Sequence, residues 1–347
     1  MAIATEPIGS IPRPTALRWA VGRGLSDEDV AALCADAVRD TIERFEATGS
    51  PVITDGEQSK PSHATYPVAG LPLDGLTVPY ADGHSRRYPT LAAGPFRYER
   101  FAATYLADAR ARTHLPVKQA VVAASALSLI YPEDGIADYS REEFLADLVD
   151  EAAADIKRCL AFGADSVQLD FSEARLALAL DPSKGMLKSF IELNNEVLDR
   201  FSETDRGRLG VHVCAGNSLG STHSAEVDPA EFLPELFNLG VGRFYLQLAR
   251  EPDARRVLAA VKESARPHHR VFVGVTTPFS ATVESPGLVR DRVLLAAEYV
   301  DPARLGTTDD CGFAPYADDT TTSRDVAFAK IRARVEGTHM ASEVLGA

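Results

Sequence analysis

An alternation of short apolar runs with longer helical patterns constrains the fold of this chain more than any other feature. Amphipathic segments such as 141–163 and 285–300 separate the runs, and this alternation favours parallel strands buried on both faces. The predicted strands comprise an N-terminal strand leading into "PIGSIP" and seven runs at 51–56, 117–123, 165–171, 209–214, 243–248, 270–276 and 305–310. Eight strand–helix units predict a single (β/α)8 TIM barrel of the α/β class, and 347 residues are enough for one.

The segment 60–112 is rich in Pro, Gly and Tyr, and we expect it to be an inserted loop region over the barrel mouth. Residues 1–347 would then form one domain. The stretch 318–330 is expected to cap and begin the last helix. No G-x-G-x-x-G or Walker pattern follows a predicted strand, which weakens the alternative of a nucleotide-binding doubly wound sheet.

The composition limits the kinds of molecule that the protein is expected to bind. The chain carries 36 basic and 50 acidic residues, a net charge of −14, which argues against nucleic acid as the main partner. No apolar stretch approaches ~20 residues, so no membrane span is expected. The start "MAIATEPIGSIPRP" lacks a signal-peptide pattern, and the expected location is the cytoplasm. Small molecules are the expected partners, and the sequence leaves open whether the protein forms a homo-oligomer.

Several polar side chains fall at or just beyond the carboxyl ends of predicted strands. In a TIM barrel these ends meet at one mouth, where the chemistry takes place. Residues far apart in the sequence would therefore converge there, namely Glu57, Asp170, His212, Cys214, Gln247 and Cys311.

His212 and Cys214 in "LGVHVCAGN" can form part of a metal site, because residues two apart on a strand point to the same side. Cys311 follows 97 residues later. A single buried cysteine is more often a small hydrophobic residue, and a lone His-x-Cys pattern is weak. Three such ligands at two strand ends favour zinc, which takes Cys and His and keeps one position open in catalytic sites. A thiol on that position would lose its proton at neutral pH.

The motifs of this chain occur in the order seen in one known family. They are "PIGSIPRP", "TDGEQ", "VQLDFSEARL", "GVHVCAGN", "VESPGLVRDRVLLAAEYVDPARLGTTDDCGF" and "DVAFAKIRARVEG". The chain thereby resembles the cobalamin-independent methionine synthases, in particular their catalytic C-terminal barrel and the related single-barrel proteins. The resemblance implies a zinc-dependent methyltransferase of methionine biosynthesis, which moves a methyl group from a methylated folate to homocysteine.

The same resemblance implies roles for individual residues. His212, Cys214 and Cys311 correspond to zinc ligands, and the residues that hold the amino-acid thiol correspond to Ser10, Glu57 and Asp170. Carboxylates can accept an α-ammonium group, while a hydroxyl and backbone N–H groups can receive its carboxylate. Without the resemblance, Glu57 would be interpreted as a solvated loop charge and Ser10 as a turn or cap residue.

The sequence departs from the family at the fourth zinc ligand. Gln247 stands where the family has a glutamate, and a neutral amide binds zinc more weakly than a carboxylate does. Either Gln247 contacts the metal or the substrate through its oxygen, or another group completes the site. His223 is the preferred substitute, although a solvated loop histidine is the common alternative; Asp310 is a second candidate, and Glu251 lies too far beyond the strand.

A second departure concerns the alkyl donor. The segment "AASALS" (123–128) replaces the family's "GPVT"-type segment, and the only tryptophan, Trp19, lies in a helical pattern and is expected to pack there. The donor, and even the thiol, can therefore differ from methylfolate and homocysteine. The basic runs 84–89 and 97–100 could meet an anionic substrate, although solvated loop charges are the more common explanation.

The expected reaction is attack of the thiolate on an activated carbon. A general acid, Asp310 or His223, would protonate the leaving nitrogen or oxygen. Three alternatives stay open: thiol addition to an epoxide or other electrophile (or the reverse C–S lyase reaction), a non-catalytic barrel that binds metal or a ligand, and a metal-free lyase.

Overall fold

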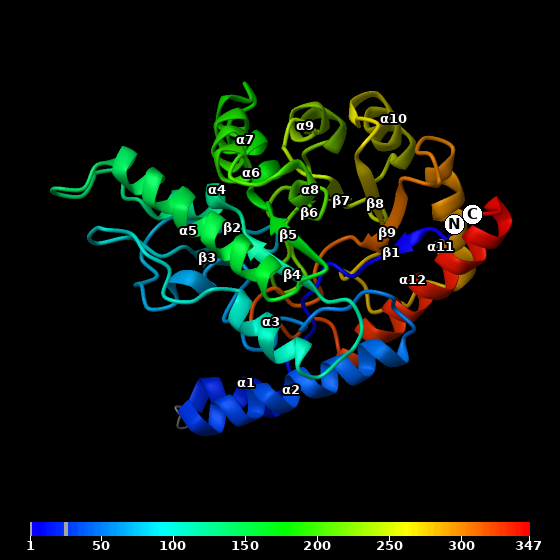
Figure 1. Cartoon of the computed structure of the whole chain (residues 1–347), viewed down its shortest axis with the longest axis horizontal. Coiled ribbons are helices and arrows are strands. Elements are labelled where there is room, and N and C mark those ends of the chain that lie inside the picture. Colours follow the sequence, from blue (N-terminus) through cyan, green and yellow to red (C-terminus); the bar gives the residue numbers. More distant parts are fainter. Residues whose placement is uncertain (1, 24–26) are drawn as a thin grey trace.

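Seven parallel strands form a curled sheet in the order β1-β9-β8-β7-β6-β5-β4, at the centre of the molecule (Figure 1). The computed structural model describes residues 2–23 and 27–347. The strands of this sheet are β1 (Ala4–Thr5), β4 (Lys118–Val122), β5 (Ser166–Asp170), β6 (Leu209–Val213), β7 (Arg243–Leu246), β8 (Arg270–Thr276) and β9 (Leu305–Asp309). Each of them lies within, or at one end of, a run that the sequence predicts as a strand, so the predicted barrel topology is confirmed.

The remaining predicted strand, 51–56, is reduced to a single bridge. Ile53 pairs with Val117 in parallel, and on its other side the hydroxyl of Thr54 donates a 2.8 Å hydrogen bond to the carbonyl of Gly9. This segment therefore joins the two edges of the sheet. Pro51 lacks an N–H, and Gly56 has a φ of 67°, so the chain turns away before a longer ladder can form.

Helices flank the sheet and connect its strands (Figure 1). They are α1 (Thr15–Arg23), α2 (Asp27–Ala47), α3 (Ala103–Arg110), α4 (Ala124–Leu127), α5 (Arg141–Ala161), α6 (Glu173–Leu180), α7 (Gly185–Leu198), α8 (Glu203–Arg206), α9 (Pro229–Leu236), α10 (Ala254–Ser264), α11 (Pro286–Ala297) and α12 (Arg324–Leu345), with 3-10 turns η1 (Tyr66–Val68) and η2 (Ser128–Ile130). Among the described residues, no helix combines the length and apolar character that a membrane crossing needs.

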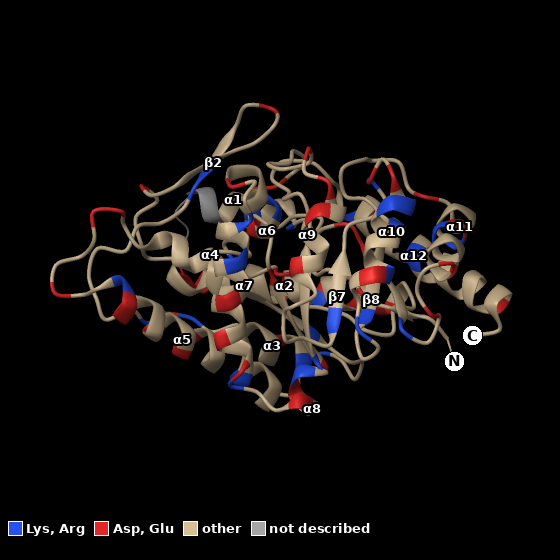
Figure 2. Ribbon diagram, turned by 90° about the horizontal axis from the view of Figure 1, so that it is seen from above, with Lys and Arg blue, Asp and Glu red and all other residues tan. Residues whose placement is uncertain are grey.

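Local sequence signals set the ends of the long helices. Ser140 and Glu143 form a reciprocal capping box at the start of α5. Ser285 caps α11, in which a proline occupies the first turn, and Ser323 caps α12 as expected for the 318–330 stretch. Figures 1 and 2 both show the two termini close together, beside α11 and α12.

The segment 60–112 includes a hairpin of β2 (Thr77–Pro79) and β3 (Ser85–Arg87) and the helix α3, which packs against α2 and α5. The N–H of Ala81 in this hairpin donates a 2.9 Å hydrogen bond to the carbonyl of Thr222, in the loop after β6. Tyr80 and Tyr88 are buried and line the cavity at the mouth. Basic and acidic residues are interspersed along the chain (Figure 2).

Inside the sheet, near the amino ends of the strands, a buried polar network crosses the barrel. Glu6 accepts hydrogen bonds from Tyr245 at 2.6 Å and from Arg243 at 2.9 Å. Lys118 donates to Gln168 at 2.7 Å, and burial lowers the pKa of Lys118 to about 8. Lys118 Nζ lies 3.8 Å from Glu6 Oε2, so the network links Glu6 to residues of β4, β5 and β7.

Candidate metal centre

His212, Cys214 and Cys311 lie together at the carboxyl end of the sheet. Their side-chain donor atoms all lie within 4.8 Å of one another, and all three residues are buried. His212 is the second-last residue of β6, and Cys214 directly follows that strand. Cys311 lies two residues beyond the end of β9. Both ring nitrogens of His212 lack a hydrogen-bond partner among the described residues. An imidazole with two unpartnered nitrogens beside two thiols is a donor set suited to a soft or borderline cation.

The two thiols lie within hydrogen-bond distance of each other. The Sγ atoms of Cys214 and Cys311 are 3.1 Å apart, and both cysteines are free. The hydrogen bond from Cys311 lowers the pKa of Cys214 well below its usual range, while that bond and burial raise the pKa of Cys311. Burial is the largest single influence on the pKa of His212 and acts to lower it, but the neighbouring Cys214 and the charge of Asp170 together raise this pKa. A buried pair of this kind needs a cation before both sulfurs can be thiolates.

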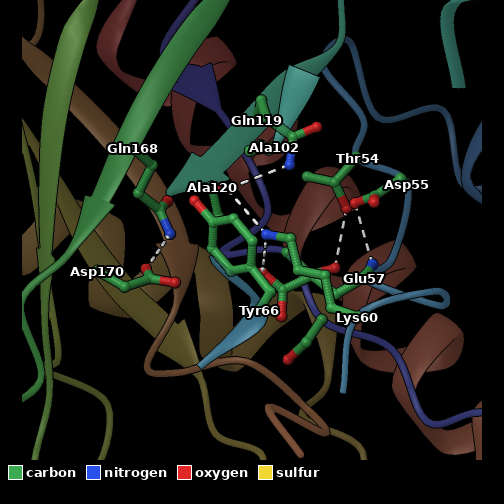
Figure 3. Close-up of polar contacts among 12 residues, drawn as sticks. Thr54, Asp55, Glu57, Lys60, Tyr66, Ala102, Gln119, Ala120, Gln168 and Asp170 are labelled. Carbon is green, nitrogen blue, oxygen red and sulfur yellow. Dashed lines mark hydrogen bonds and ion pairs between the residues drawn. The ribbon is translucent and has the colours of Figure 1, made fainter. Parts of the chain in front are cut away.

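Three residues that the sequence assigns to the thiol substrate line the same cavity: Ser10, Glu57 and Asp170. Figure 3 shows Glu57 beside Lys60, and Asp170 held by Gln168. Lys60 lies 3.2 Å from Glu57 Oε1, whereas Glu57 Oε2 has no hydrogen-bond partner among the described residues. Gln168 donates to Asp170 at 2.8 Å.

Burial first, and then the charge of Glu57, raise the pKa of Asp170. A cationic group placed between them would relieve this repulsion. The hydroxyl of Ser10 accepts from the N–H of Ala314 at 3.2 Å, next to the Cys311 loop.

Gln247 and Asp310 lie behind the metal centre, and neither is among the described residues that line the cavity. The carbonyl of Gln247 accepts from the N–H of Ala215 at 3.0 Å, and its amide donates to Glu251 at 2.7 Å. Asp310 accepts from the N–H groups of Leu248 and Ala249, at 2.8 Å each. Burial raises the pKa of Asp310 to about 7. Both side chains thus fix the loops that carry the cysteines.

His223 lines the cavity but is not part of the group of three donors. Its Nδ1 lies 3.0 Å from the hydroxyl of Ser224, and its ring meets that of Tyr80 edge-on at 5.5 Å. Burial lowers the pKa of His223 to about 4, so the imidazole is neutral at neutral pH.

Sequence reasoning did not single out two further residues that line the cavity, His63 and Glu173. His63 follows the strand around Ile53 in an irregular loop, and its ring packs edge-on against Tyr316 at 5.3 Å. No pattern in the sequence marks it. Glu173 begins α6 three residues after Asp170. That spacing, directly after a strand end, is a signal that could have placed its carboxyl group at the mouth.

Comparison with curated proteins finds two relatives that match along nearly their full length. The chain is 23% identical to methionine synthase of Sulfurisphaera tokodaii over 360 residues, which cover 99% of this chain and 94% of the relative. It is 21% identical to methionine synthase of Thermococcus kodakarensis, over 97% of this chain and 93% of the relative. No protein-family model matches the chain. The resemblance to methionine synthases stated from the motifs is confirmed.

Solved structures show the same fold. The B12-independent methionine synthase from Shewanella sp. W3-18-1, a complex with selenomethionine, superposes with a TM-score of 0.78 at 19% identity, covering 100% of both chains. A protein from Listeria monocytogenes assigned as a vitamin B12-independent methionine synthase superposes with a TM-score of 0.66 at 19% identity, covering 97% of this chain and 98% of that one.

Proposed function

We propose that this chain, whose full-length curated relatives are methionine synthases, transfers a methyl group to the thiol of homocysteine with the help of one bound Zn²⁺. The class of enzyme, a methyltransferase, follows from those relatives. The metal, the acceptor and a methylated folate as donor are our proposal.

One observation carries the proposal: an imidazole and two free thiols meet at the barrel mouth, and neither ring nitrogen has another partner among the described residues. These residues fit zinc by their chemistry, with His212, Cys214 and Cys311 as protein ligands and one position left for substrate. When bound, zinc keeps a thiol deprotonated and nucleophilic at neutral pH.

The rest of the cavity suits an amino-acid thiol. Glu57 and Asp170 supply two buried carboxylates for an α-ammonium group. Ser10 and the loop around Gly312 can receive the α-carboxylate by a hydroxyl and backbone N–H groups. Tyr80, Tyr88 and Tyr316 line the cavity, and their bulky side chains would limit the access of water to the reacting sulfur.

An assay of the purified protein with homocysteine and methyltetrahydrofolate tests the proposal, with methionine as the measured product. Zinc content is determined on the same sample. We expect one zinc per chain and methionine formation that stops when a chelator removes the metal. Thioether formation from an epoxide without methionine would favour the alternative thiol chemistry, and bound zinc without any thiol reactivity would favour a binding protein.

A further inference from the structure

Glu173 places a buried carboxyl group in the cavity, at the first residue of α6. Its side chain is 3% exposed. The hydroxyl of Ser125 donates to Glu173 Oε1 at 2.5 Å, and Asn194 in α7 donates to that hydroxyl at 2.7 Å. The N–H of Ser125 in turn donates to Asn194 at 3.2 Å. Three elements therefore hold this carboxyl group in one orientation.

The other oxygen of Glu173, Oε2, is buried and has no hydrogen-bond partner among the described residues. A buried polar atom without a partner is costly, and where it belongs to a residue that lines a cavity, a bound ligand can supply the missing hydrogen bond. Leu176, one turn along α6, and Leu129, one turn after Ser125, line the cavity beside it. Tyr88 also lines the cavity and interacts with Glu173, whereas Glu57 and Asp170 belong to the proposed thiol site.

Glu173 is the buried acid best suited to hold a proton there. Burial raises the pKa of Glu173 to about 8, against the opposing effect of the Ser125 hydrogen bond, and the charge of Asp170 adds to the rise. Tyr88 is the other titratable group that interacts with it, and burial keeps this phenol neutral. His223 is unprotonated at neutral pH, and Asp310 lies outside the cavity.

We propose that Glu173 donates a proton through Oε2 to the leaving nitrogen of an N-alkyl donor bound between α4 and α6. This inference rests on the proposed thiol methyl transfer. In the step, the thiolate sulfur forms a bond to the methyl carbon and the carbon–nitrogen bond breaks. Its electron pair goes to nitrogen, which takes the proton of Glu173, so that a secondary amine leaves and a carboxylate stays until solvent protonates it again.

The assignment fixes the class of donor. A neutral tertiary amine needs a proton to leave, because an amide anion is a poor leaving group. A sulfonium donor needs none, since it leaves as a neutral thioether. A buried, protonated carboxyl group therefore fits a neutral N-methyl heterocycle better than a cationic donor.

Glu173→Gln tests the inference, because the amide keeps the shape and an acceptor for Ser125 but carries no transferable proton. Methyl transfer from methyltetrahydrofolate to homocysteine is compared with alkylation of bound homocysteine by methyl iodide, whose leaving group needs no proton. We expect kcat with methyltetrahydrofolate to fall by roughly 10²-fold or more, with the methyl iodide rate and the zinc content unchanged. Glu192→Gln, at an exposed position in α7, is the matched control.

The pH profile gives a second readout. An acid is active below its pKa, so wild-type kcat should fall as pH rises through about 8, and Glu173→Gln should lose this alkaline limb. Ser125→Ala removes a hydrogen bond that favours the carboxylate, and the limb should move to higher pH. If Glu173→Gln slows the reaction equally with both methyl donors, or leaves the rate with methyltetrahydrofolate unchanged, the inference is overturned. Methionine formation by the wild type would still uphold the proposed function in that case. No wild-type product from methyltetrahydrofolate overturns both.

Discussion

The sulfur atoms of Cys214 and Cys311 lie 3.1 Å apart, although 97 positions and two intervening strands of the sheet separate the residues. The curl of the sheet brings the ends of β6 and β9 toward the same point at the barrel mouth. The distance is longer than the ~2.05 Å of a disulfide, and both residues are free thiols. The pair, completed by His212, is the part of the molecule on which the proposed chemistry depends.

Cys214→Ser and Cys311→Ser should each lose most of the bound zinc, because a serine hydroxyl is a far poorer ligand than a thiolate. Gln247→Ala should retain most of it, since the amide of Gln247 is occupied by Ala215 and Glu251. Metal analysis of the three purified variants after dialysis checks this expectation. Full zinc occupancy in both cysteine variants would show that the ligand assignment is wrong.

Glu57→Gln and Asp170→Asn should weaken binding of the amino-acid thiol. Each removes one charge that faces an α-ammonium group, and a hydrogen bond to a charged group contributes about 1.5–3 kcal/mol, which corresponds to roughly 10- to 100-fold in KM. Steady-state kinetics with homocysteine measure the change. The control substrate is 4-mercaptobutanoate, which lacks the ammonium group; an equal loss with both thiols would argue against this role.

Asp155 should make stability depend on pH. Its carboxylate accepts from Tyr66 and from the N–H of Ala102, yet burial raises its pKa to about 6. The folded protein therefore keeps a proton that the unfolded chain, with a pKa of about 3.9, releases. The free energy of unfolding should fall by roughly 1–3 kcal/mol as pH rises from about 4 to about 6.

Urea unfolding across this pH window measures the slope for wild type and for Asp155→Asn, which mimics the protonated acid. The variant should show a shallower slope than wild type. Asp150→Asn changes an exposed residue of the same helix and serves as the control. An identical slope in wild type and Asp155→Asn would contradict the expectation.

The sequence predicts the barrel and the meeting of the three metal donors because both follow from strand periodicity. Once His212, Cys214 and Cys311 are placed at carboxyl ends of parallel strands, the fold brings them together whatever the loops do. The predicted strand at 51–56 does not form a regular strand, since Pro51 and Gly56 confine its pairing to Ile53.

The sequence does not reveal which polar side chains are already engaged. Gln247 stands at the family's ligand position, but its carbonyl oxygen is engaged by Ala215, 32 residues earlier, and its amide by Glu251, four residues later, and no periodicity encodes these bonds. The same holds for Asp310, which bonds to two N–H groups beyond β7. The spacing after Asp170 could have placed Glu173 at the mouth, but it does not show that Ser125, 48 residues away, fixes one of its oxygens.

Substitution of Co²⁺ for the proposed zinc should reveal whether the thiol substrate takes the open position. Two cysteines give thiolate-to-cobalt absorption, and a substrate thiolate on the metal should increase its intensity when homocysteine is added. The reason is that His212, Cys214 and Cys311 supply three donors, whereas a tetrahedral site takes four. Methionine, a thioether without a thiolate, is the matched ligand and should not increase the band. An unchanged spectrum with saturating homocysteine would mean that the thiol does not bind the metal, and that a protein group such as His223 fills the fourth position instead.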